Sequence, residues 1–295
     1  MSKNLKWISA LLLLVVLIAG LGFGGYHYYR ISTELNATQS ELASTTASLT
    51  EQVQQRDDAI TTLNAQLSQQ QQVNNSYGTE VGQLSSTVSQ LSKLATIDPQ
   101  LLAKYSKVYF LNENYVPAKL SNIDPQYEYG TKTLQFESDA LPFLVALLQA
   151  ARTSGVDLSV ISAYRSYGTQ SLLKSDYKTT FGTASANSFS ADQGYSEHQL
   201  GTAVDFTTQT VADTFSGFDK TSTFTWLTNN AYQYGFEISY PKGNAYYVFE
   251  PWHWRFVGVR LATMLHAEHE NFYDVDQRTI NLYLITLFDP ISTGG

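Results

Sequence analysis

The sequence of 295 residues contains no cysteine, which excludes disulfide bonds and thiolate ligands for a metal ion. It is also short of basic residues: 18 lysines and arginines are outnumbered by 26 acidic residues, and the net charge is −8. Because nucleic-acid-binding proteins usually present a basic face, this balance argues against nucleic acid as a partner. The lack of cysteine is compatible with an exported protein.

Proline is absent from the first third of the chain. All seven prolines lie at or after position 99, and the composition of the chain changes at the same point. Together with a long apolar run near the start, these shifts divide the sequence into residues 1–30, 31–97 and 98–295. The last segment is long enough for one domain with a core of its own.

The one long apolar run covers residues 7–23. Its length is at the short end for a membrane-spanning helix, and the tyrosines that follow it can extend the span. Lys3 and Lys6 precede the run and only Arg30 follows closely, which predicts a cytoplasmic N-terminus with the rest of the chain outside. We expect a single-pass anchor in the cell membrane, with a cleaved signal peptide as the alternative.

Residues 33–97 are rich in serine, threonine, glutamine and asparagine, and apolar residues recur there in two series with a period of seven. The series include Leu35, Leu42, Leu49, Val53, Ile60 and Leu67. This pattern predicts a coiled-coil stalk and leaves open a homo-oligomer formed through it. Residues 74–78 and Gly82 weaken the middle, so a flexible tether is the alternative.

The third segment predicts an α+β domain with a small antiparallel sheet and flanking helices. Helices are expected at 138–154, 168–177, 222–234 and 261–272. Strands are expected at 107–111, 158–162, 203–206, 236–240 and 246–257, with a strand-like run after 281. A turn at 241–244 joins two of these strands as a hairpin, so the sheet should be largely antiparallel.

Two short blocks, residues 196–206 and 250–257, concentrate ionisable side chains. They contain two imidazoles and one carboxylate, on His198, Asp205 and His253. This set suits a catalytic zinc ion that keeps one coordination position open for water. Glu250, three positions before the last histidine, is a candidate general base. From the residues alone, ordinary core histidines remain the alternative to a metal site.

The local patterns indicate how the two blocks could converge. Gly201 permits a tight turn before an alternating strand at 203–206, which places Asp205 on one face of that strand. In the second block, His253 and Arg255 share a face. Residues on neighbouring strands and on the loop that leads into one of them can then reach a single ion.

Three blocks resemble those of the VanY-type D-alanyl-D-alanine carboxypeptidases, relatives of lysostaphin-type peptidases and of the hedgehog domain. Residues 196–206, SEHQLGTAVDF, resemble the pattern SxHxxGxAxD, and residues 250–258, EPWHWRFVG, resemble EPWHxRxVG. Residues 162–170, SAYRSYGTQ, are similar to SGYRSxxxQ. The resemblance spans roughly 101–265. Residues 192–195 depart from the Pro-Gly pair common in the family, so we expect a changed loop at the rim of the site.

The resemblance implies a role for each matching residue. It implies zinc ligands at His198, Asp205 and His253, a catalytic base at Glu250, a substrate-facing Arg165, and weaker candidates for binding the terminal carboxylate at Gln170 and Ser196. The implied substrate is the peptide stem of peptidoglycan, and the implied reaction removes its C-terminal D-alanine. D,D specificity is favoured and L,D specificity stays open. A loop at 182–193 is expected over the site.

Three alternatives to a carboxypeptidase remain. The domain could be a catalytically inactive module that binds the cell wall, or a peptidoglycan endopeptidase, or the cargo of a structural coiled-coil protein. Glu250 beside a complete set of metal ligands favours an enzyme over a binding module. Arg165 and the candidate carboxylate-binding residues favour cleavage at a chain end, because a free carboxylate exists only there.

Overall fold

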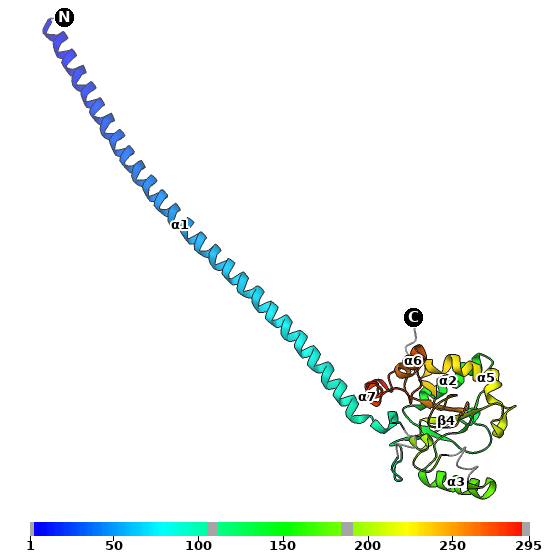
Figure 1. Ribbon diagram of the computed structural model, residues 1–295. Coiled ribbons are helices and arrows are strands. Elements are labelled where there is room, and N and C mark those ends of the chain that lie inside the picture. Colours follow the sequence, from blue (N-terminus) through cyan, green and yellow to red (C-terminus); the bar gives the residue numbers. More distant parts are fainter. Residues whose placement is uncertain (1–2, 105–110, 184–190, 291–295) are drawn as a thin grey trace. The chain divides into compact units, whose positions relative to one another are not determined.

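The computed structural model describes residues 3–104, 111–183 and 191–290 (Figure 1). The chain divides into two compact units, residues 1–85 and 86–295. The predicted strand at 107–111 lies, except for Leu111, outside the described residues, and so does most of the expected loop at 182–193. The two units are described separately below.

A single helix, α1 (Lys3–Thr96), forms the described part of the first unit and continues into the second. Its N-terminal part is long and apolar enough to cross a membrane, which is compatible with the expected anchor. The helix runs through Gly78 and Gly82 without a break. Many of its threonine hydroxyls donate to the carbonyl four residues earlier, as Thr46 does to Leu42.

The heptad side chains lie exposed along α1, Leu42 for example at 66%. A continuous helix is what a coiled coil requires, whereas the flexible tether would have interrupted it. The coiled coil and the homo-oligomer formed through it stay predictions.

The second unit is built on a four-stranded antiparallel sheet. The strand order is β3 (Ser159–Ser162), β4 (Ala203–Thr207), β6 (His253–Phe256) and β5 (Phe236–Ile238). A separate two-stranded sheet pairs β1 (Leu120–Asn122) with β2 (Gln135–Glu137). The antiparallel arrangement is confirmed, and β5 pairs with β6 as predicted, although residues 239–252 connect the two strands in place of the tight turn at 241–244.

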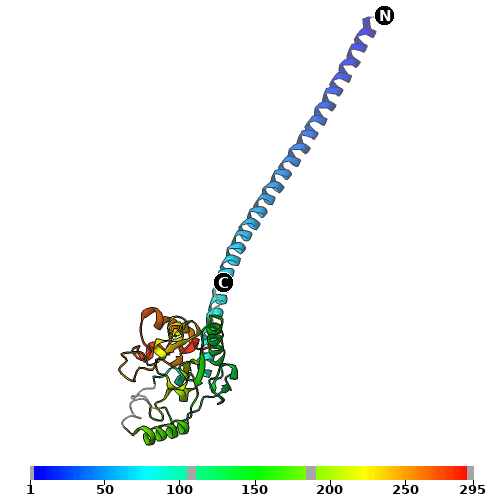
Figure 2. The ribbon, with the colours of Figure 1, turned by 90° about the vertical axis from the view of Figure 1, so that its right-hand side faces the viewer.

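Among the described residues, five short α-helices accompany the sheet. They are α2 (Leu141–Thr153), α3 (Tyr167–Phe181), α5 (Ser222–Asn230), α6 (Val259–Glu268) and α7 (Gln277–Asn281). Three of them, α2, α5 and α6, contact the same 3-10 turn at Ala231–Tyr234. In both views of the ribbon α3 lies at the opposite end of this unit from α6 (Figures 1 and 2).

The core explains why β4 carries the site. Every residue of β4 is buried. Val204 and Phe206 belong to the hydrophobic core, together with Phe256 of the neighbouring strand. Because side chains alternate across a strand, Asp205 points to the other side of the sheet. The predicted alternation at 203–206 is therefore confirmed, and it delivers one carboxylate into a well-packed scaffold.

Several predicted boundaries and one predicted strand are wrong. Residues 246–249 form no strand: 246 and 247 lie in a bend, where the side-chain oxygen of Asn244 accepts hydrogen bonds from the backbone N–H groups of Tyr246 and Tyr247. The expected strand-like run after 281 is not a strand: residues 282–288 form turns around the short 3-10 helix Leu284–Thr286. The helix predicted at 222–234 ends at Asn230 and continues as a 3-10 turn.

Candidate metal centre

The sheet register brings the two predicted blocks together. Asp205 on β4 lies directly opposite His253 on β6. His198 comes from the 3-10 turn Glu197–Leu200 that leads into β4. Gly201 ends this turn with φ of 73°, a left-handed conformation that glycine adopts without strain. The short turn thus returns the chain to β4 with His198 beside Asp205.

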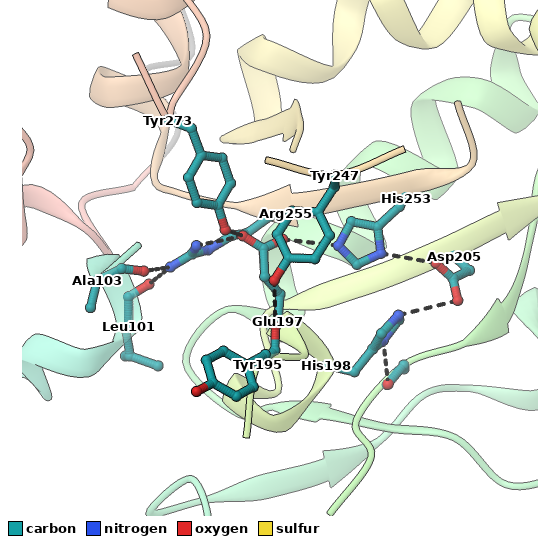
Figure 3. Close-up of polar contacts among 11 residues, drawn as sticks. Leu101, Ala103, Tyr195, Glu197, His198, Asp205, Tyr247, His253, Arg255 and Tyr273 are labelled. Carbon is teal, nitrogen blue, oxygen red and sulfur yellow. Dashed lines mark hydrogen bonds and ion pairs between the residues drawn. The ribbon is translucent and has the colours of Figure 1, made fainter. Parts of the chain in front are cut away.

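Three side chains converge as a metal site requires (Figure 3). His198 Nε2 lies 3.2 Å from Asp205 Oδ2, and His253 Nδ1 lies 3.1 Å from Asp205 Oδ1. One ligand atom from each of the three lies within 4.8 Å of the others, and all three residues are buried. Two imidazole nitrogens and a carboxylate oxygen suit zinc and leave a coordination position open.

The outer nitrogen of each imidazole is also held in place. His198 Nδ1 lies 2.7 Å from the carbonyl oxygen of Ala163, which can only accept, so this nitrogen carries the hydrogen. His253 Nε2 lies 2.9 Å from Glu197 Oε2. Such outer contacts fix the tautomer and direct the inner nitrogen toward a metal ion. The residues present therefore fit a bound zinc ion.

Burial and neighbouring charges shift the pKa values of the two histidines in opposite directions. Burial, together with the positive charge of Arg165, lowers the pKa of His198 to about 4. Burial also acts to lower the pKa of His253, but the hydrogen bonds to Asp205 and Glu197 outweigh it and raise that pKa to about 10. At neutral pH the metal-free site thus holds a neutral His198 and a protonated His253.

We predict that zinc binding releases a proton from His253. An imidazolium with a pKa near 10 must lose its Nδ1 hydrogen before that nitrogen can bind a metal. The Kd for zinc should therefore fall about tenfold per pH unit from about pH 6 to 8, with about one proton released per ion at about pH 6. Calorimetry in two buffers of different ionisation enthalpy measures this number, and a pH-independent Kd would refute it.

Glu250 occupies a turn next to the ligands. Its backbone N–H donates to the carbonyl of Tyr240, and its own carbonyl accepts from the N–H of His253. Burial raises the pKa of the partly buried Glu250 carboxyl to about 7, with His253 acting against it and Asp205 adding to it. A carboxyl with a pKa near neutrality can both accept and return a proton, as a general base requires.

Arg165 lies near the same centre, just beyond the end of β3. Its backbone N–H donates to the carbonyl of His198 at 3.1 Å, and its charge lowers the pKa of both His198 and Glu250. Its Nε is buried and has no hydrogen-bond partner among the residues that the structure describes. A fixed cation with spare donor capacity could bind a substrate carboxylate.

The two weaker candidates are buried. Gln170, on α3, donates from Nε2 to the carbonyl of Ala191 at 2.8 Å, which ties α3 to the segment before the site. Ser196 precedes the 3-10 turn without capping it through its side chain. For both, a role in binding substrate stays a prediction. At the expected changed loop, the carbonyl of Tyr195 accepts from the Tyr247 hydroxyl at 2.8 Å.

Glu197 is a site residue that was not predicted from the sequence. It lies between two predicted residues, is fully buried, and contacts His253, Arg255 and Tyr273. Burial acts to raise its pKa, but Arg255 and His253 outweigh this effect and lower the pKa to about 2. The sequence held one signal for it. Arg255 shares a strand face with His253, which indicates that its charge is buried, and a buried arginine requires a carboxylate partner.

Comparison with known proteins agrees with this geometry. Residues 133–259, which contain all three blocks, match the VanY family of D-alanyl-D-alanine carboxypeptidases. YodJ of Bacillus subtilis (strain 168), a protein designated a carboxypeptidase, is 31% identical over 274 residues, covering 90% of this chain and 94% of YodJ. The chain belongs to the VanY family. The resemblance indicated by the three sequence blocks is therefore confirmed.

Further relatives match a little over half of this chain. A D-alanyl-D-alanine carboxypeptidase of Enterococcus faecalis (strain ATCC 700802 / V583) is 29% identical over 177 residues, which is 56% of this chain and 63% of that protein. The structure of the LD-carboxypeptidase LdcB matches with a TM-score of 0.55 and 31% identity, covering 60% of this chain and 85% of LdcB. The proteins similar to this chain thus include both a D-alanyl-D-alanine carboxypeptidase and an LD-carboxypeptidase.

Proposed function

We propose that this VanY-family chain is a zinc-dependent carboxypeptidase that removes the C-terminal D-alanine from peptidoglycan stem peptides. The observation that carries the proposal is the convergence of His198, Asp205 and His253 beside Glu250, within the part of the chain that matches the family. D,D specificity is favoured by the family description and the enterococcal relative. L,D specificity is the alternative, which the similarity to LdcB supports.

The residues divide the chemical work. His198, Asp205 and His253 would hold the zinc ion, which when bound supplies a Lewis acid that polarises the scissile carbonyl. Glu250 accepts a proton from the attacking water and returns it to the leaving amine, so no net proton is consumed. Arg165 binds the terminal carboxylate of the substrate or the negative charge that develops during attack.

We also propose that the chain is held at the cell membrane by one span. Residues 1–30 would form the anchor with its N-terminus in the cytoplasm, residues 31–97 the stalk, and residues 98–295 the extracytoplasmic catalytic domain. The apolar start of α1 and the lysines before it support this arrangement. A tether of this kind would keep the enzyme near the peptidoglycan that lies outside the membrane.

The proposal predicts that the enzyme needs a free carboxylate at the end of its substrate. A stem pentapeptide should lose its last alanine. The same peptide with a C-terminal amide should react at least about tenfold more slowly, because a hydrogen-bonded ion pair with Arg165 is lost. Mass spectrometry of timed samples gives both rates.

Arg165→Gln provides the matched control. In this variant the acid and the amide should react at similar rates, because the cation that distinguishes them is gone. Equal cleavage of both peptides by the unchanged chain, or internal fragments released from cross-linked dimers, would indicate an endopeptidase and remove Arg165 from carboxylate binding.

A further inference from the structure

A buried carboxylate lies behind the metal ligands, on the side of His253 away from Asp205 (Figure 3). Glu197 has 0% of its surface exposed. Its Oε2 accepts from His253 Nε2 at 2.9 Å, and its Oε1 accepts from Arg255 Nη1 at 2.7 Å and from the Tyr273 hydroxyl at 2.6 Å. Two donors from β6 and one from the segment after α6 thus converge on one carboxylate.

Arg255 carries this network away from the site. It is fully buried, and its Nη2 donates to the carbonyl of Leu101 at 2.8 Å and to that of Ala103 at 2.9 Å. These carbonyls belong to the segment that begins at the 3-10 turn Pro99–Leu102, shortly after the end of α1. A continuous path of hydrogen bonds therefore joins this segment to His253.

Burying an ion pair is costly, so the arrangement calls for a reason. Removing two charges from water is unfavourable, and a fold in which apolar side chains of similar volume replace a buried ion pair is often equally stable or more stable. Glu197 and Arg255 do not line a substrate-facing surface, because neither is exposed. What the pair does provide is a fixed acceptor for Nε2 of His253, and so a fixed direction for its Nδ1 toward Asp205.

We propose that Glu197 is a positioning residue that orients His253 for the metal, and that Arg255 ties this orientation to residues 101–103. The inference rests on the proposed zinc site and adds the residues that shape it. A neutral acceptor would hold His253 less well, because the amide group of a glutamine can turn its N–H toward the ring and favour the tautomer that blocks Nδ1.

The test is the affinity of the full chain, in detergent, for zinc. Glu197→Gln should weaken the Kd about tenfold to a hundredfold, as loss of an outer contact to a metal-bound histidine does. The Kd is measured by competition with a chromophoric chelator, and the melting temperature of the zinc-free protein is recorded alongside. A purely structural role would lower the melting temperature without changing the Kd of the folded protein.

The matched control is Glu237→Gln. Glu237 is also buried and lies opposite Arg255 in the sheet register, and within the described part of the chain it forms no ion pair with His198 or His253. Its isosteric replacement should leave the Kd for zinc within about threefold. If Glu197→Gln does not fold, Tyr273→Phe tests the positioning role in its place. It removes one hydrogen-bond donor to Glu197 and should weaken the Kd for zinc about threefold to tenfold.

The tie to residues 101–103 has its own readout. In the unchanged chain, zinc binding should slow the exchange of backbone amide hydrogens in this segment, because coupling between two sites is reciprocal. In Glu197→Gln that slowing should disappear. If the zinc Kd of Glu197→Gln, or of Tyr273→Phe where Glu197→Gln does not fold, stays within about threefold of that of the unchanged chain, Glu197 does not position His253. If zinc does not alter amide exchange at residues 101–103 in the unchanged chain, Arg255 does not link this segment to the site. Both readouts concern zinc binding, so a chain that binds zinc but cleaves no peptide would refute only the proposed function.

Discussion

Replacing Glu250 with glutamine should reduce peptide hydrolysis about a hundredfold to ten-thousandfold while zinc remains bound. Glu250 lies in the turn before His253 but is not one of the three converging ligands. Its carboxyl has a pKa of about 7, so it can accept a proton near neutral pH, and a glutamine amide cannot. Activity is followed as release of the terminal residue, and zinc is measured on the same samples by atomic absorption.

Glu268→Gln is the control for this variant, because it makes the same chemical change at an exposed position on α6. It should match the unchanged chain in both activity and zinc content. If Glu250→Gln kept activity within a few-fold of the unchanged chain, Glu250 would not be the general base. If it lost the zinc as well, Glu250 would have to be counted among the residues that hold the metal.

His253→Ala should lose both the zinc and the activity. The substitution removes one of the three proposed ligand side chains and deprives the buried carboxylates of Asp205 and Glu197 of the group between them. Two ligands do not make a zinc site, and the uncompensated carboxylates should also destabilise the domain. Metal analysis after dialysis gives the stoichiometry, which we expect to fall from about one ion per chain to none.

His266→Ala controls for the loss of a histidine elsewhere. His266 lies exposed on α6, with its ring stacked on Tyr232 at 3.8 Å between centroids. This variant should retain its zinc. A His253→Ala protein that is folded by circular dichroism and still holds about one zinc ion would show that the metal is bound elsewhere.

The main elements were predictable wherever one local signal dominated. The apolar repeat of α2 and the alternation in β4 come directly from side chains that face the core, and both appear in the structure. The helix α1 likewise follows from a long stretch without proline. Residues 246–249 misled the prediction because their aromatic pattern resembles a strand, whereas the side chain of one residue, Asn244, folds the backbone into a turn.

The site was predictable only in part for a similar reason. The three candidate ligands could be named because they fall in blocks that resemble a family, whereas spacing alone left ordinary histidines as the alternative. Glu197 escaped prediction because its partners, Arg255 and Tyr273, come from distant parts of the chain. A buried charge becomes interpretable only when the groups that compensate it are known, and these are set by the fold.

The most direct test of the proposed carboxypeptidase is mass spectrometry of stem peptides after incubation with the zinc-loaded full chain. The proposal predicts that a pentapeptide ending in D-alanyl-D-alanine loses a single alanine, and that Glu250→Gln leaves it intact. Loss of alanine from a tetrapeptide alone would instead indicate L,D specificity. Peptides that stay unchanged in the presence of a zinc-loaded chain would contradict the proposal and leave a module that binds the cell wall without cutting it.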